Sequence, residues 1–110
     1  MTRGQYIEAV KRELRKIPSE KRKLFTLALE KITRILSKKV PVEIMFYPSP
    51  HLAKFKGVIG WYVVPEMDDD SRASEKNLID FFGLLRFFIV EEDFSIIPII
   101  TLDPKDLVLK

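Results

Sequence analysis

The densest cluster of functional side chains in the sequence consists of Lys and Arg. The stretch "KRELRKIPSEKRK" at residues 11–23 holds seven basic side chains and only two acidic ones. Lys and Arg neutralise phosphate groups, and each such contact releases condensed counterions from a nucleic acid. The leading functional hypothesis is therefore binding of a DNA or RNA backbone, without sequence reading. Its predicted residues are Lys11, Arg12, Arg15, Lys16, Lys21, Arg22 and Lys23. A solvated helix surface is the plainer interpretation, and it stands beside this hypothesis.

Charge is divided unevenly along the chain. Residues 1–39 contain twelve Lys and Arg against four Glu, a net charge of +8, whereas residues 40–110 contain seven against twelve, a net charge of −5. Such asymmetry predicts a partner of opposite sign for the first third of the chain. That partner is a nucleic acid, an acidic protein or the chain's own second half.

Two further interpretations follow from the same pattern. The alternative function is a homodimeric interaction or structural protein without a nucleic-acid role, in which the basic residues of one subunit meet acidic groups near Asp68–Asp70 or Glu91–Asp93 of the other. A third interpretation is attachment to a membrane surface through the second helix, which requires that helix to expose apolar side chains.

Aromatic and basic residues also mix in one predicted hairpin. Exposed rings beside Lys stack on the bases of single strands. Burial in a core competes with this interpretation, because large apolar side chains are mostly buried. The residues concerned are Tyr47, His51, Lys54, Phe55, Lys56, Trp61 and Tyr62.

Residues for catalysis or metal binding are sparse. Cysteine is absent, His51 is the single histidine, and the four glycines are scattered, which leaves no phosphate-binding loop or nucleophile with a base. The run "EMDDD" at 66–70 lacks the spacing of a calcium loop, so an acidic loop is favoured over a cation site. We therefore predict no enzyme activity, metal, cofactor or small-molecule ligand.

Length and composition predict one domain, residues 1–110. With 46% hydrophobic residues the chain is large enough to bury a core. Abundant charge, one Asn, one Gln and no Cys are typical of proteins that work at high temperature. No signal-peptide pattern opens the chain, and the apolar stretch 78–90 is shorter than the roughly 20 residues of a membrane span. We expect a cytoplasmic protein without a membrane span.

Two helices are predicted in the basic part, residues 1–39. Thr2 and Gln5 have the spacing of a capping box, and Pro18 ends the first helix at Ile17. A second helix is predicted over 20–38, and the short connection favours an antiparallel helical hairpin. The expected core residues of this second helix are Leu24, Phe25, Leu27, Ala28, Ile32, Ile35 and Leu36.

The acidic part, residues 40–110, is predicted to form a sheet. Expected are strands at 42–47, 55–64, 84–90 and 94–102, a loop at 48–54, a short helix at 74–82, and an apolar tail that adds a little pairing. Because Pro98 cannot donate to a ladder, the last strand is expected at an edge or with a bulge. The predicted fold is α+β, with the helical hairpin on a mostly antiparallel four-stranded sheet, in the order α-α-β-β-(α)-β-β.

Overall fold

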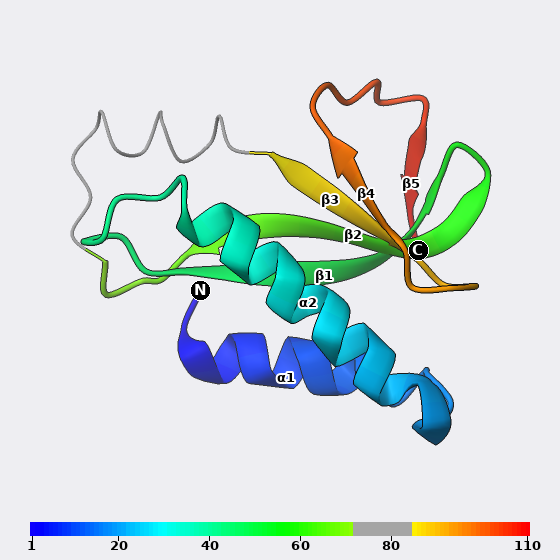
Figure 1. Cartoon of the computed structure of the whole chain (residues 1–110), viewed down its shortest axis with the longest axis horizontal. Helices are drawn as coiled ribbons and strands as arrows, with labels where there is room; N and C mark the ends of the chain where they lie inside the picture. The colour runs from blue at the N-terminus through cyan, green and yellow to red at the C-terminus, as the bar shows by residue number, and fades with distance from the viewer. Residues whose placement is uncertain (72–84) are drawn as a thin grey trace.

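A five-stranded antiparallel sheet with two helices forms the molecule (Figure 1). The computed structural model describes residues 1–71 and 85–110, so the helix predicted at 74–82 lies outside the described residues. The elements in chain order are α1 (Arg3–Leu14), the 3-10 turn η1 (Ser19–Lys21), α2 (Arg22–Ser37), β1 (Phe46–Phe55), β2 (Val58–Met67), β3 (Arg86–Val90), β4 (Ile96–Ile99) and β5 (Leu107–Leu109). The predicted α+β class is confirmed.

The sheet has the strand order β4-β3-β2-β1-β5. Strands β1 to β4 pair each with the next along the chain, and β5 returns to pair with the last three residues of β1, Ala53–Phe55. The predicted four-stranded sheet was wrong by one strand, because the apolar tail forms β5. The strand predicted at 84–90 is confirmed as β3, and Pro98 lies in the edge strand β4.

The loop predicted at 48–54 was wrong, because these residues are the middle of β1. Lys110 donates its backbone N–H to Leu52 O at 2.9 Å, and Lys56 donates its backbone N–H to Asp106 O at 2.7 Å. The backbone polar groups of Leu52 and Lys56 therefore point toward β5. Every second residue of a strand directs its backbone polar groups to the same neighbouring strand, so the backbone nitrogens of Pro48 and Pro50 also point away from β2. Their missing N–H groups therefore cost no hydrogen bond between β1 and β2.

A tight turn joins β1 and β2, where a long loop had been expected. Lys56 and Gly57 both have positive φ, 48° and 82°, as the two central residues of a type I′ turn require. The backbones of β2 and β3 approach each other closely at Gly60. A Cβ at this position would lie 2.0 Å from the backbone oxygen of Ile89 in β3.

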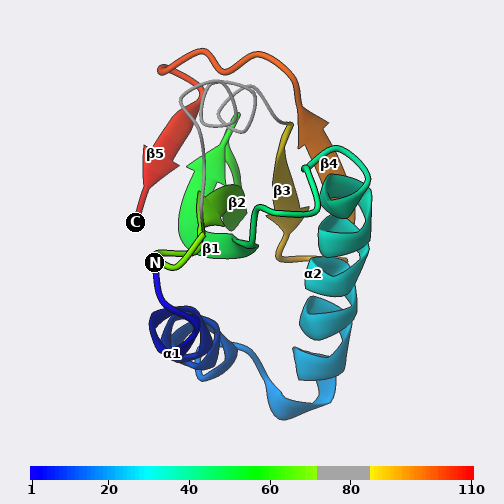
Figure 2. The ribbon, with the colours of Figure 1, turned by 90° about the vertical axis from the view of Figure 1, so that its left-hand side faces the viewer.

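The helices do not form the hairpin that the short connection predicted. In Figures 1 and 2, α1 lies beside β1, whereas α2 crosses the sheet over β1 and β3. Each helix therefore packs mainly on the sheet and not on the other helix.

The capping box at the start of α1 is confirmed. Gln5 donates its backbone N–H to Thr2 Oγ1 at 3.1 Å, and Thr2 donates its backbone N–H to Gln5 Oε1 at 2.9 Å.

Hydrophobic side chains are buried on both faces of the sheet. On the α2 face, Trp61 contacts Phe25 edge to face at a centroid distance of 4.9 Å and stacks on Phe94 at 6.0 Å. The opposite face holds a smaller cluster around Tyr62 and Phe88. Three residues expected in the core of α2 are exposed, and the prediction for them was wrong. They are Leu24, Leu27 and Ile35, with exposed fractions of 48%, 40% and 38%.

Candidate functional site

The turn between α1 and α2 is fixed by one of the predicted basic residues. Arg22 Nε donates to Leu14 O at 3.0 Å and to Ile17 O at 3.1 Å. Leu14 is the last residue of α1, where backbone acceptors lack a partner within the helix, and Ile17 lies in the turn that follows. Arg22 thus holds the start of α2 against the end of α1 and brings together the basic residues on either side of the turn.

Two more predicted residues flank a buried carboxylate. Glu13 is almost completely buried and accepts a hydrogen bond from Trp61 Nε1 at 3.1 Å. Lys16 Nζ lies 3.3 Å from Glu13 Oε2, and Arg12 Nε lies 3.5 Å from Glu13 Oε1. Arg12 and Lys16 together therefore retain one positive charge beyond that of the carboxylate.

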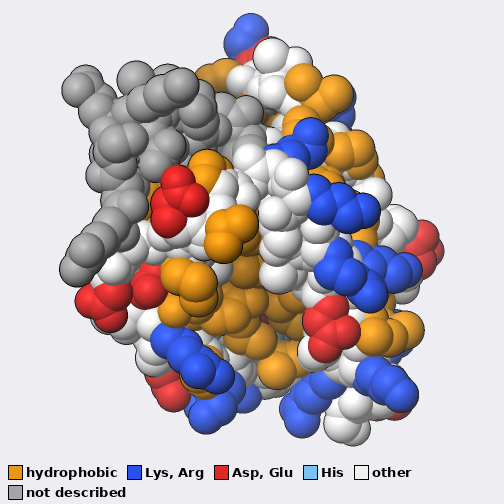
Figure 3. All heavy atoms as spheres, turned by 60° about the vertical axis from the view of Figure 1, so that its left-hand side comes forward, with side chains coloured by type: hydrophobic (Ala, Val, Ile, Leu, Met, Phe, Trp, Pro, Cys, Tyr) orange, Lys and Arg blue, Asp and Glu red, His pale blue; other side chains and the backbone are white. Residues whose placement is uncertain are grey.

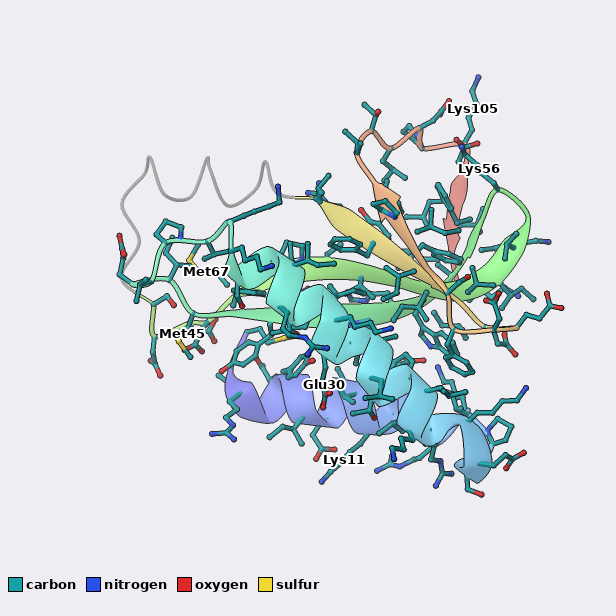
Figure 4. The ribbon with its side chains drawn as sticks, viewed as in Figure 1. Lys11, Glu30, Met45, Lys56, Met67 and Lys105 are labelled. Atoms are coloured by element: carbon teal, nitrogen blue, oxygen red, sulfur yellow. The ribbon has the colours of Figure 1, made fainter. Side chains whose placement is uncertain are left out.

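The other four predicted residues differ in their surroundings. Lys11 lies 4.0 Å from Glu8 in an exposed pair, and Figure 4 shows its side chain projecting from α1. Arg15, Lys21 and Lys23 are exposed and form no ion pair within the described part of the chain. We call the surface formed by Arg15, Lys16, Lys21 and Lys23 the basic turn.

The acidic second half does not neutralise the basic first third in the parts of the chain that the structure describes. The Lys and Arg side chains of residues 1–39 form ion pairs only with Glu8 and Glu13, both in α1. No carboxylate from 40–71 or 85–110 lies within ion-pair distance of these side chains. The N-terminal ammonium of Met1 pairs with Asp69, but the described part of the chain's own second half, one of the three partners that the charge asymmetry predicted, forms no ion pair with these Lys and Arg side chains.

A cleft of about 720 Å³ opens beside the basic turn. Lys16 and Lys21 line the cleft, and Trp61 and Phe94 are among its apolar lining. Lys110, which the sequence reasoning missed, also lines this cleft; its distance from Lys16 in the sequence offered no signal of proximity. The acidic residues Glu91 and Glu92 line the same cleft and oppose the binding of an anionic ligand beside them.

The stacking surface considered for the first hairpin is not formed. Phe55, Trp61 and Tyr62 are buried in the two cores, and Tyr47 stacks on Tyr6 at a centroid distance of 5.0 Å. The core interpretation is therefore confirmed for Phe55, Trp61 and Tyr62. Tyr47 and His51 are partly exposed.

The described residues also contain no metal site. His51 Nε2 lies 3.7 Å from Glu66 Oε1, yet no group of three or more His, Asp or Glu among residues 1–71 and 85–110 is placed to hold a metal ion.

None of the helices in this described part has the length and apolar character needed to cross a membrane.

No family model, curated protein or solved structure matches this chain. The candidate site therefore depends on the residues of this chain alone. Within it, the basic turn brings Arg15, Lys21 and Lys23, which form no ion pair among the described residues, close together in the sequence.

Proposed function

We propose that this protein binds the phosphate backbone of nucleic acid through the basic turn, without reading the base sequence. The observation that carries the proposal is that Arg15, Lys21 and Lys23 have no carboxylate partner among the described residues, although the chain is rich in acids elsewhere. Exposed cations without an internal counterion attract polyanions most strongly.

Recognition of base sequence is not part of the proposal. A recognition helix has to present the residues of its first turn to the bases. Phe25, in the first turn of α2, is completely buried under the sheet residue Trp61. Contacts to phosphate require no such helix and tolerate the curved surface of a turn.

The test is a salt titration with fluorescently labelled single-stranded and duplex oligonucleotides, followed by anisotropy. Three to five phosphate contacts predict a slope of log K against log salt of about −2 to −3.5 on a single strand. We expect measurable binding at about 50 mM salt that weakens strongly by about 200 mM. Absence of binding at the lower salt concentration contradicts the proposal.

The homodimer remains the second candidate and is tested by light scattering. One feature opposes association through the free edge of β4. Val90 donates its N–H to Ser95 O at 2.9 Å, so by alternation Pro98 points away from β3, toward the free edge. Pro98 has no N–H to offer there, which disfavours pairing with the strand of another molecule.

A further inference from the structure

The outer side of α2 combines exposed apolar and basic residues. With 100° between successive helix residues, seven positions fall within one arc of about 120°. The arc contains four cations, three large apolar side chains and no acid. We call it the outer strip; its members are Lys23, Leu24, Leu27, Lys31, Arg34, Ile35 and Lys38.

The apolar members of the outer strip are not needed for the core. The core side of α2 is already filled by Phe25, Ile32 and Leu36, which are fully buried. Leu24, Leu27 and Ile35 nevertheless leave between 38% and 48% of their surface exposed on the same side of one helix. Apolar residues gathered on one surface are typical of a contact with another molecule.

The strip continues into a groove between α2 and the sheet. This groove has a volume of about 580 Å³. Its apolar lining comes from Ile35 of α2 and from Leu85, Phe87, Ile96 and Pro98 beside and within β3 and β4. Its basic lining is Lys31, Arg34 and Lys38, and none of its described lining residues is acidic.

The cations of the strip are free to meet a partner. None of Lys31, Arg34 and Lys38 forms an ion pair within the described part of the chain. Figure 3 shows Lys and Arg side chains next to hydrophobic ones on the right-hand side of that view, with a few Asp and Glu side chains among them. An occupant of matching chemistry has an apolar stripe flanked by carboxylates.

The backbone next to the groove limits the form of that occupant. Strand addition at β4 requires a free row of N–H and C=O groups, and Pro98 interrupts this row. An amphipathic helix needs no backbone donors from its receptor, because its own backbone is satisfied internally. A flat lipid surface reaches the convex strip but not the floor of the groove.

We propose that the outer strip and the adjoining groove bind an acidic amphipathic helix of a partner protein. Leu or similar side chains of this helix fill the groove over Phe87 and Ile96, and its Asp or Glu residues lie beside Lys31 and Arg34. This site is distinct from the basic turn, with which it shares only Lys23. Failure of one proposal therefore leaves the other intact.

The probe is a synthetic helical peptide of about 16 residues with Leu at every third and fourth position and Glu on both flanks. Its control is a scrambled peptide of the same composition that lacks the stripe. We expect saturable binding of the first peptide to the full chain by calorimetry, and amide shifts confined to α2, β3 and β4. Equal binding of the scrambled peptide, or no binding of either, overturns the proposal.

Variants locate the contact. Leu27→Glu and Arg34→Glu are each expected to weaken peptide binding at least tenfold. Thr26→Glu, on the exposed polar side of the same helix, and Lys105→Glu, which lies outside the strip and the groove at the upper right of Figure 4, are expected to leave it unchanged. Circular dichroism checks the fold, and Arg34→Ala replaces any variant that unfolds. Equal losses in the strip variants and the controls contradict the assignment.

Other occupants have their own signatures in the same experiment. Vesicles rich in phosphatidylglycerol that sediment the wild type but not Leu27→Glu, with no peptide binding, identify a lipid surface and overturn the proposal. A concentration-dependent dimer in light scattering that Leu27→Glu abolishes identifies a second copy of the chain and overturns it as well.

Discussion

Trp61 donates its indole N–H to the buried carboxylate of Glu13, and this bond of 3.1 Å joins β2 to α1 across 48 positions of sequence. The carboxylate in turn holds Lys16 beside the basic turn, at 3.3 Å. One buried acid thus connects the hydrophobic core with the proposed binding surface. A hydrogen bond to a charged, buried group is stronger than one between neutral groups.

Replacing Glu13 by Leu is expected to destabilise the fold. The Trp61 N–H loses its acceptor, and an unsatisfied buried donor costs about 1–3 kcal/mol. Glu13→Gln keeps an acceptor and is expected to cost less. Urea unfolding followed by the fluorescence of Trp61, the only tryptophan, measures both changes.

A matched control for the two Glu13 variants is Glu8→Gln on the same helix. Glu8 and Lys11 form an exposed pair at 4.0 Å, so its loss is expected to change stability by less than about 0.5 kcal/mol. A Glu13→Leu protein as stable as the wild type would show that the indole finds another acceptor.

Gly60→Ala is expected to be strongly destabilising, at or above the upper end of the about 1–3 kcal/mol that overpacking costs. The added Cβ would lie 2.0 Å from Ile89 O and 2.8 Å from the Phe88 ring, so β2 and β3 have to separate. Thermal unfolding measures the effect.

Gly57→Ala provides the comparison for Gly60→Ala. A Cβ at Gly57 meets nothing within 4 Å, and only the positive φ of 82° opposes it, at a cost of about 1–2 kcal/mol. If Gly57→Ala proves the more damaging of the two, the close approach of β2 and β3 at Gly60 is wrong.

Several parts of the fold could be predicted because their signals are local. The capping box of Thr2 and Gln5, the strand ending at Val90 and the edge position of Pro98 each follow from neighbouring residue types. Local patterns also gave the correct α+β class.

Other parts depend on partners distant in the sequence. Pro48 and Pro50 suggest a loop until it is known that both point away from β2, which sequence alone does not reveal. Two prolines spaced two apart were the available signal, because such residues share one side of a strand. The burial of Glu13 had no such signal, since its acceptor role depends on Trp61.

The sequence predicted the excess of basic residues but not which of them have partners within the protein. Their sequence positions gave the excess of charge, but only the structure reveals that Arg22 bonds to backbone carbonyls and that Arg12 and Lys16 share Glu13. The exposure of Leu24 and Leu27 was missed because a helical wheel does not give the width of the packed face.

Alkaline pH is expected to weaken the contact between α1 and β1. Burial of Tyr6, stacked on Tyr47, raises the pKa of its phenol from 10.0 to about 12. Between these values the unfolded chain binds fewer protons than the folded one, so stability falls as pH rises from about 10 to 12. Tyr6→Phe keeps the ring and lacks this titration.

The measurement is the unfolding free energy of both proteins at several pH values. Lys side chains also lose charge in this range, so the difference between the wild type and Tyr6→Phe isolates the phenol. That difference is expected to change in favour of Tyr6→Phe above about pH 10. A constant difference would mean that Tyr6 ionises freely in the folded protein.

Pro98→Val is expected to promote self-association. Valine restores an N–H to the free edge of β4 and has high strand propensity, so another strand can pair there. Light scattering at increasing protein concentration detects the change, with Pro104→Val in the 100–106 loop as control. Equal behaviour of Pro98→Val and the wild type would indicate that this edge is protected by other means.

The most direct test of polyanion binding by the basic turn compares salt slopes for a single-stranded oligonucleotide. Arg15→Ala is expected to reduce the slope by about 0.7 to 1 unit and to weaken binding at about 50 mM salt, because one phosphate contact is lost. Lys105→Ala removes the same charge at the opposite end of the molecule in Figure 4 and is expected to leave the slope unchanged. Identical slopes for the wild type and both variants would contradict binding at the basic turn.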